Sequence, residues 1–216
     1  MNAYSEIYLD DAMDNLGEAF DYSSLRGYSL DEFLDMFIAC GLARQFASGF
    51  PKYICGMSGT ELAIEVIERT GLGSELKEDV AGDYLHNNFG PDYWCGWILA
   101  YYQWKTGLDF SVIKEYLPMS EIRKLYPILH EASEERCVDA FNAIYKRRGM
   151  PTRLHKYRKI SGLSQKELSD KSGVGLRMIQ QYEQRAKDIN KASAGALHAL
   201  AKSLNCTMEN LLEPEL

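Results

Sequence analysis

The chain has few cysteines, and their arrangement is not typical of a metal site or a disulfide framework. They number five in 216 residues, an odd count, and no two of them form a Cys-x-x-Cys motif. They are scattered along the sequence at Cys40, Cys55, Cys95, Cys137 and Cys206. We therefore expect reduced, buried thiols, which is the usual state of cysteine in a cytoplasmic protein.

Long apolar runs are also missing. The longest apolar stretch, residues 94–102, is far shorter than the roughly 20 residues that a membrane-spanning helix needs. Residues 1–21 have neither the basic start nor the apolar centre of a secretory signal. These absences predict a cytoplasmic protein with no membrane partner.

Residues that could form a catalytic or metal site are sparse. The four histidines, His86, His130, His155 and His198, lack metal-ligand spacing from one another and from the cysteines. No Gly-rich segment is followed by the Lys and Ser or Thr of a phosphate-binding loop. We therefore expect no catalytic residues, no bound metal and no cofactor. An enzyme is the class of protein that the sequence supports least.

Charge is separated along the chain. Residues 146–216 hold 14 Lys and Arg against 7 Asp and Glu, whereas residues 1–145 hold 10 against 24. All the phenylalanines, all the tryptophans and all the tyrosines except Tyr157 and Tyr182 lie in the acidic part. A basic segment suits DNA because it displaces counterions from the duplex. The acidic part would be repelled by DNA, and we expect it to face another partner.

The acidic part is expected to be helical. Residues 5–20 predict a first helix, with Ile7, Tyr8, Ala12, Leu16 and Phe20 on one face. Further helices are expected at 42–47, 109–117 and 120–126, the last two ended by prolines 118 and 127. Residues 71–91 are expected to form an irregular loop.

Three serines predict helix starts in the same part. Ser29 and Ser58 are each followed three residues later by Glu, which is the spacing of a capping box. Ser133 precedes a helix with Glu in its first turn and Lys and Arg in its last, an order that the helix dipole favours.

The most hydrophobic helix is expected over residues 92–106, with Asp92 as its cap. Its large aromatic residues have three possible roles: core packing, a protein interface or the wall of a ligand pocket. Because one helix in a small bundle cannot bury so many large rings, we expect some to contact a partner. The candidates are Trp94, Trp97, Tyr101 and Trp104.

The segment from Gln165 to Gln184 has the pattern of a helix-turn-helix. Ser164 and Glu167 form a capping box, and Gly173 stands eight residues after Gln165, where the turn needs a positive φ. Leu168, Val174, Ile179 and Tyr182 fall on the inner sides of the two helices. This pattern predicts that the second helix presents its other face to a DNA major groove.

The outward face holds side chains suited to reading bases, namely Leu176, Arg177, Gln180 and Gln181. Arg can bond guanine with both arms, Gln can pair with adenine, and Leu can contact a thymine methyl group. For Leu176 a contact to a second protomer is the alternative. Candidate phosphate contacts surround this face at Gln165, Lys166, Arg185, Lys187 and Lys191. One or two of the basic residues of the preceding helix, Arg153, Lys156, Arg158 and Lys159, are also expected to approach the DNA backbone.

Residues 152–213 resemble Cro/XRE-type helix-turn-helix domains, the phage-repressor class. The residues that carry the resemblance are Leu154, Tyr157, Gly162, Leu163, Ser164, Gln165, Leu168, Gly173, Val174, Ile179, Gln180, Tyr182, Glu183, Leu200, Leu204, Asn210, Leu211 and Leu212. The resemblance implies base contacts from positions 176, 177, 180 and 181 and a phosphate bond from Gln165. Two positions depart from the family pattern: Gly175 replaces a Ser or Thr cap, and Gln184-Arg185 replaces Asn-Gly.

The sequence thus predicts an all-α protein: a helical N-terminal domain over 1–148, a linker over 149–152 and a five-helix DNA-binding domain over 153–216. Because one such module reads a half-site, we expect a homodimer on operator DNA. The N-terminal part, with residues 8–13, 51–59 and 99–104, also resembles antitoxin-type regulators, which implies a toxin partner and repression of a shared operon. A one-component repressor that binds a small effector is the alternative.

Overall fold

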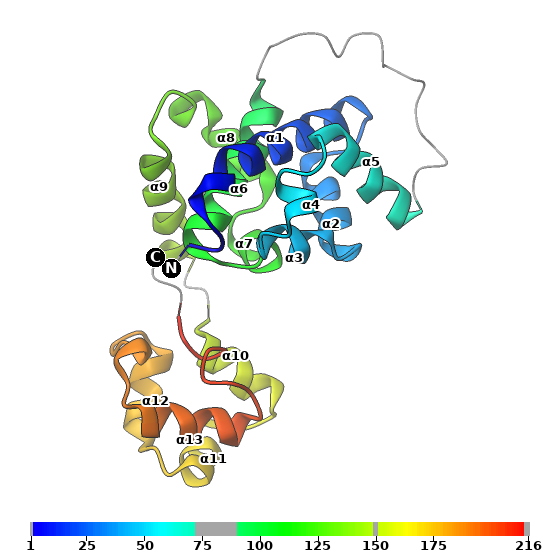
Figure 1. Ribbon diagram of the computed structural model, residues 1–216. Helices are drawn as coiled ribbons and strands as arrows, with labels where there is room; N and C mark the ends of the chain where they lie inside the picture. The colour runs from blue at the N-terminus through cyan, green and yellow to red at the C-terminus, as the bar shows by residue number, and fades with distance from the viewer. Residues whose placement is uncertain (1, 72–89, 149–150, 214–216) are drawn as a thin grey trace. The chain divides into compact units, whose positions relative to one another are not determined.

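The computed structural model describes residues 2–71, 90–148 and 151–213, and every structural statement below refers to these residues. By its internal contacts the chain divides into two compact units, Met1–Arg148 (unit 1) and Gly149–Glu215 (unit 2). The described residues contain helices and no strand (Figure 1), which confirms the expected all-α class.

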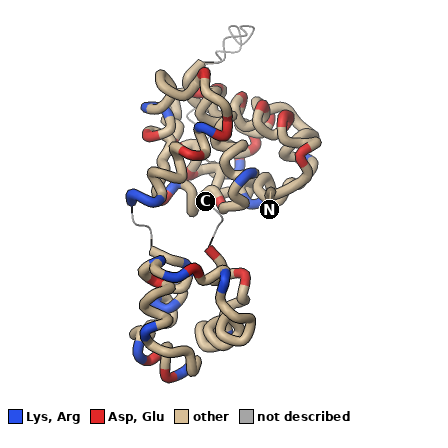
Figure 2. The backbone as a smooth tube through the Cα atoms, turned by 90° about the vertical axis from the view of Figure 1, so that its left-hand side faces the viewer, with Lys and Arg blue, Asp and Glu red and all other residues tan. Residues whose placement is uncertain are grey.

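Unit 1 consists of a 3₁₀ helix and nine α-helices in its described part. In chain order they are η1 (Glu6–Tyr8), α1 (Leu9–Leu25), α2 (Leu30–Ala39), α3 (Leu42–Ala47), α4 (Pro51–Ile54), α5 (Gly59–Thr70), α6 (Pro91–Thr106), α7 (Phe110–Tyr116), α8 (Met119–Leu129) and α9 (Glu134–Arg147). Asp and Glu positions are spread over many of these helices (Figure 2), in agreement with the charge of this part of the sequence.

The expected helix starts at three serines are confirmed. Ser29 and Ser58 each form a complete capping box with the Glu three residues later, and the Ser133 hydroxyl accepts a hydrogen bond from the Arg136 N–H. Each cap satisfies an N–H group that a helix start leaves without an intrahelical partner. Local sequence therefore fixes where α2, α5 and α9 begin.

The centre of unit 1 is the packing of α1 against α6 (Figure 1), with α5 on another side of α1. Two glycines allow these close approaches. A Cβ atom on Gly96 of α6 would stand 2.4 Å from the Leu16 carbonyl oxygen, and one on Gly59 of α5 would stand 2.2 Å from the Asn15 carbonyl oxygen. Because the obstacles are backbone atoms of α1, no side-chain rotation can relieve either clash.

Gly96→Ala is expected to destabilise unit 1 by about 1–3 kcal/mol, the usual cost of overpacking a filled core, because α1 and α6 must separate. The measurement is urea unfolding, followed by tryptophan fluorescence for unit 1, which holds all three tryptophans, and by amide hydrogen exchange for unit 2. Gly195→Ala, in a helix of unit 2 where nothing lies within 4 Å of the new Cβ, is the matched control. That variant should be neutral or slightly stabilising. Equal unfolding midpoints for Gly96→Ala and the unmutated chain would contradict the packing argument.

The first helix differs from its expected bounds. It begins at Leu9 and extends to Leu25, while the preceding residues form the 3₁₀ helix η1. Ala12, Leu16 and Phe20 are fully buried as expected, but Ile7 is 79 % exposed and Tyr8 is 39 % exposed. The change from 3₁₀ to α geometry shifts the helical phase, so Ile7 and Tyr8 do not continue the buried stripe.

Two further expectations about helix ends in unit 1 were wrong. Helix α8 continues through Pro127 to Leu129, because burial of Ile122 and Leu129 on one face offsets the hydrogen bond that proline removes. The cap of α6 is Gly90, with Asp92 already in the first turn.

All five cysteines are free thiols, but only Cys95 and Cys137 are buried, and Cys55 is exposed.

Unit 2 contains α10 (Arg153–Ile160), α11 (Gln165–Ser172), α12 (Leu176–Glu183), the 3₁₀ helix η3 (Ile189–Lys191) and α13 (Ala194–Leu204). Four α-helices and one 3₁₀ helix thus make up its described helical elements, and the Thr152 hydroxyl caps α10 by accepting from the His155 N–H. Residues 149–150 of the expected linker and 72–89 of the expected loop lie outside the described residues. No helix in the described ranges has the length and apolar character needed to cross a membrane.

Candidate nucleic-acid interface

Helices α11 and α12 are joined by a short turn whose geometry follows from the sequence. The Ser164 hydroxyl accepts from the Glu167 N–H at 3.1 Å, and the Ser164 N–H donates to the Glu167 carboxylate at 2.7 Å. Gly173 ends α11 with a φ of +72°, a left-handed conformation that glycine adopts without strain. The expected cap and turn of the helix-turn-helix are confirmed.

The core of unit 2 fixes which face of α12 is outside. Leu168 of α11 is fully buried, as is Ile179 of α12, and Tyr182 is 4 % exposed. They pack in one cluster with Leu154, Ile189, Leu197, Leu200, Ala201, Leu204 and Leu211. Since Ile179 and Tyr182 hold one face of α12 in this cluster, the opposite face is available for a ligand.

The four residues expected to read bases share the remaining surface of α12. Leu176 and Arg177, in the first turn, are exposed, while Gln180 and Gln181 are half-buried. Gly175 precedes α12 and offers no side-chain cap, so no side-chain hydrogen bond satisfies the first N–H groups of this helix. Helix N–H groups of this kind favour an anion such as a phosphate.

Three basic side chains from different segments line one hollow of unit 2. Arg177 of α12, Lys187 after it and Lys191 of η3 lie around the starts of α12 and α13, where Gly175 and Ser193 are also part of the lining. These three cations were expected as one base contact and two phosphate contacts, and the fold brings them together. Positive charge beside two helix N-termini suits a phosphate backbone.

The other expected phosphate contacts lie in different surroundings. Lys166 is exposed in the first turn of α11. Gln165 is half-buried and donates through Nε2 to the Glu183 carboxylate at 2.8 Å. Arg185 donates through Nη2 to the Glu213 carboxylate at 3.2 Å. DNA would therefore have to share or replace the carboxylate partners of Gln165 and Arg185.

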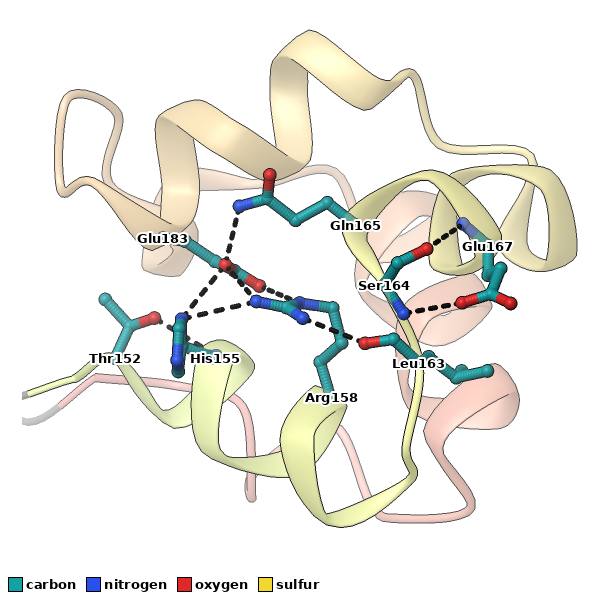
Figure 3. Close-up of polar contacts among 8 residues, drawn as sticks. All are labelled: Thr152, His155, Arg158, Leu163, Ser164, Gln165, Glu167 and Glu183. Atoms are coloured by element: carbon teal, nitrogen blue, oxygen red, sulfur yellow. Dashed lines mark hydrogen bonds and ion pairs between the residues drawn. The ribbon is translucent and has the colours of Figure 1, made fainter.

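A buried ion pair stands behind the interface (Figure 3), and the sequence did not lead us to expect it. Arg158 of α10 donates to both carboxylate oxygens of Glu183 of α12, at 2.6 and 2.8 Å. Its remaining Nη1 donates to the Leu163 carbonyl at 2.8 Å. The two side chains are only 6 % and 3 % exposed. One or two of four basic residues, Arg153, Lys156, Arg158 and Lys159, were expected near the DNA backbone, and its burial excludes Arg158 from that set.

Glu183 has polar partners from two helices, α10 and α11. Besides Arg158, Gln165 of α11 donates to Oε2, and the His155 Nδ1 lies 3.1 Å from the same oxygen (Figure 3). Burial alone would raise the pKa of Glu183, but the hydrogen bonds from Arg158 and Gln165 and the charge of Arg158 lower it overall. The network therefore stabilises unit 2 at neutral pH, and this stabilisation is lost as the pH falls through the lowered pKa.

The same network orients the interface. Gln165 is held at the start of α11 by Glu183, which is the last residue of α12. A bidentate Arg–carboxylate pair restricts rotation more than a single hydrogen bond does. Glu183 thus sets the side-chain position of Gln165 and the position of α12 relative to α10.

Arg185 adopts a left-handed backbone conformation, with a φ of +56°, at the position where the resembled family has Gly. This conformation costs a non-glycine residue roughly 1–2 kcal/mol. We expect Arg185→Gly to raise the stability of unit 2 by about 0.5–1 kcal/mol while weakening DNA binding equally for all sequences. Urea unfolding and binding to two unrelated duplexes measure the two effects. Arg185→Gln, which removes the charge and keeps the strain, is the control, and a gain in its stability would contradict this account.

Most of the aromatic partner candidates of α6 are buried within unit 1. Trp94, Tyr101 and Trp104 are 8 %, 7 % and 3 % exposed, and the Trp104 indole N–H donates to the Tyr4 carbonyl at 2.9 Å. Only Trp97 is half-buried. This burial corresponds to the core-packing alternative for three of the four. Partner binding stays a prediction, and Trp97 is its best-placed candidate.

The part of the chain that the structure describes holds no group of three His, Cys, Asp or Glu side chains placed to bind a metal ion.

In comparisons with known proteins, residues 154–211 match the family model described as helix-turn-helix. No curated protein and no solved structure matched the chain. The fold of unit 2 agrees with this match, which supports an XRE-like helix-turn-helix over residues 154–211 and a sequence-specific DNA-binding transcriptional regulator.

Proposed function

We propose that the chain is an operator-binding repressor whose helix α12 enters the major groove. Leu176, Arg177, Gln180 and Gln181 then face base edges, and the phosphate contacts come from Gln165, Lys166, Arg185, Lys187 and Lys191. The observation that carries this proposal is the convergence of Arg177, Lys187 and Lys191 around the starts of α12 and α13. A reading side chain and backbone-binding lysines thereby share one surface.

The regulator acts as a homodimer in this proposal. One helix-turn-helix reads only a half-site, and a dimer places two recognition helices about one helical turn of DNA apart. The exposed Leu176 fits either a thymine methyl group or the second protomer. Operator symmetry and the stoichiometry of the protein–DNA complex, measured together, distinguish the two.

Unit 1 is proposed to bind a toxin protein, so that the chain is an antitoxin that represses its own operon. The acidic excess of residues 1–145, 24 Asp and Glu against 10 Lys and Arg, supports a basic partner. This charge would also keep unit 1 away from the duplex while unit 2 binds. The partner would cover an acidic surface and not the DNA-binding face.

Co-purification tests the toxin role. The tagged full chain is expressed with the products of the genes next to its own, and each neighbour is also expressed alone. We expect one neighbour to co-purify in fixed stoichiometry and to arrest growth on its own. The matching DNA test is repression of a reporter that carries the DNA upstream of the chain's own gene. If no neighbour binds and none is toxic, the toxin role is wrong, whatever the reporter shows.

A second candidate is a one-component repressor whose unit 1 binds a small effector. One observation favours it: an aromatic hollow on unit 1, lined in part by Trp94 and Trp97. In this case an added effector changes operator affinity in the purified chain without a second protein.

A further inference from the structure

Unit 1 has a hollow of about 350 Å³ between α1, α6 and α8. Its lining comprises Asp14 of α1, Tyr93, Trp94 and Trp97 of α6, Tyr126 of α8 and His130, the residue after α8. Ligand sites for small molecules run from roughly 300 to 1,000 Å³, so this one suits a small group. Five of its six lining side chains are aromatic rings, and the sixth is a carboxylate.

The rings on the α8 side are held by one another. The Trp94 and Tyr126 rings form a T-shaped pair at a centroid distance of 5.5 Å, and the His130 ring stacks on Tyr126 at 4.6 Å. The His130 Nδ1 also lies 2.8 Å from the Tyr126 carbonyl oxygen. Ring pairs at these distances are favourable contacts, so the wall is ordered before any ligand enters.

The α1 side supplies negative charge. The Tyr93 hydroxyl donates to the Asp14 carboxylate at 2.8 Å, and its ring lies against Gly17, where a Cβ atom would stand 2.9 Å from it. Burial raises the pKa of Tyr93, and the carboxylates of Asp14, Glu18 and Asp21 raise it further. Tyr93 is therefore a neutral hydrogen-bond donor beside a cluster of anions.

Aromatic rings with a carboxylate at the rim are the combination that binds organic cations. The faces of Trp and Tyr rings carry negative charge density and attract alkylammonium and guanidinium groups, while a carboxylate adds a full charge. An anion would be repelled by Asp14, and a neutral group would gain no attraction between full charges from it.

We propose that this hollow binds a small organic cation, an alkylammonium or alkylguanidinium group, between Trp97, Tyr93 and Asp14. The group belongs either to a free small molecule or to a Lys or Arg side chain of a basic partner. This proposal depends on unit 1 alone. It therefore stands or falls separately from operator binding by α12.

The three tryptophans of the chain make the test specific. Indole N–H signals of the ¹⁵N-labelled full chain are followed by NMR during titration with choline and, separately, with methylguanidinium. Trp94 and Trp97 line the hollow, whereas the Trp104 indole is bonded to the Tyr4 carbonyl and serves as the internal control. We expect the signals of Trp94 and Trp97 to shift in a saturable way while that of Trp104 stays in place.

Neutral molecules of the same shape separate cation binding from simple burial. These are 3,3-dimethylbutan-1-ol for choline and methylurea for methylguanidinium, and we expect each to bind about tenfold more weakly than its cation. Equal binding of the neutral partner, or no saturable shift with either cation, would overturn the proposal.

Variants test the named residues. Trp97→Ala and Asp14→Asn should each weaken cation binding by about tenfold, whereas Asp109→Asn, a carboxylate of the same unit outside the hollow, should not. Trp97→Phe keeps a ring and should retain most of the affinity if the alanine variant folds poorly. The assignment would be overturned if Asp14→Asn, Trp97→Phe and Trp97→Ala all bound the cation with the affinity of the unmutated chain.

The source of the cation is settled in the same titration. Acetyl-Gly-Arg-Gly-amide is compared with acetyl-Gly-Gln-Gly-amide, its neutral counterpart. Selective binding of the Arg peptide supports the proposal with a protein side chain as the occupant. Binding of choline or methylguanidinium without the peptide supports it with a free small molecule as the occupant.

Discussion

Arg177→Ala is expected to lower the preference for operator over non-operator DNA strongly, by about 5- to 150-fold, and to leave the fold of unit 2 intact. Arg177 is exposed in the first turn of α12 and does not belong to the buried cluster of Ile179 and Tyr182. A bidentate Arg–guanine contact discriminates by roughly 1–3 kcal/mol, which corresponds to about 5- to 150-fold between operator and non-operator DNA. The measurement is the ratio of the two dissociation constants at one salt concentration.

Lys187→Ala is the matched control, because Lys187 lines the same hollow as Arg177. A phosphate contact carries no sequence information, so this variant should weaken binding to operator and non-operator DNA by the same factor. It should also reduce the slope of log affinity against log salt by about 1. An equal loss of sequence preference in both variants would contradict the roles assigned to them.

Glu183→Ala is expected to unfold unit 2 under conditions in which unit 1 stays folded. The substitution leaves the Arg158 guanidinium buried, 6 % exposed, without its carboxylate. Breaking a buried ion pair in this way costs about 3–5 kcal/mol, which is a large part of the stability of so small a unit. DNA binding should be lost together with the fold, because the same change releases Gln165 and the end of α12.

The two units can be followed separately. All three tryptophans, Trp94, Trp97 and Trp104, lie in unit 1, so tryptophan fluorescence reports the unfolding of that unit and amide hydrogen exchange in α10 to α13 reports unit 2. We expect unchanged fluorescence transitions and lost exchange protection in Glu183→Ala. The double variant Arg158→Leu with Glu183→Leu removes both charges and should recover most of the protection. If the amides of Glu183→Ala were as protected from exchange as those of the unmutated chain, the ion pair would not hold unit 2 together.

Helix caps and turns were predictable because their signals are local. Ser29, Ser58 and Ser164 each begin a helix with Glu three residues later, and Gly173 ends α11 in the left-handed conformation that its place in the motif indicated. The capping hydrogen bonds span three residues and depend little on the rest of the fold. The family match to residues 154–211 agrees with these local signals.

The Arg158–Glu183 pair was missed because it joins residues far apart in the chain, and charge near a DNA-binding helix was interpreted as surface. A signal was nevertheless present. Arg158 follows the buried Leu154 by four residues, and Glu183 follows the buried Ile179 by four, so each lies on the inner face of its helix. A charged residue on a buried face predicts a buried partner of opposite sign.

The aromatic residues of α6 show a different limit. Helical spacing gave the position of Trp94, Tyr101 and Trp104 on one helix, but α1, α8 and the segment around Tyr4 decide how much of each ring is covered. The helices packed around α6 bury most of its aromatic rings. An argument from the sequence of α6 alone underestimated this burial. Likewise, Pro127 lies within α8 because the burial of Leu129 outweighs the hydrogen bond that the proline removes. Only the packed structure shows which of the two effects is larger.

Selection from random duplex DNA tests the central claim most directly. The purified full chain is incubated with the library at about 150 mM salt, and bound sequences are enriched and read. The account predicts a two-fold symmetric motif with half-sites about 10 base pairs apart, and Arg177→Ala is expected to lose the preference at one base pair of each half-site. Enrichment of no sequence, or of the same sequence by both proteins, would contradict base reading by α12.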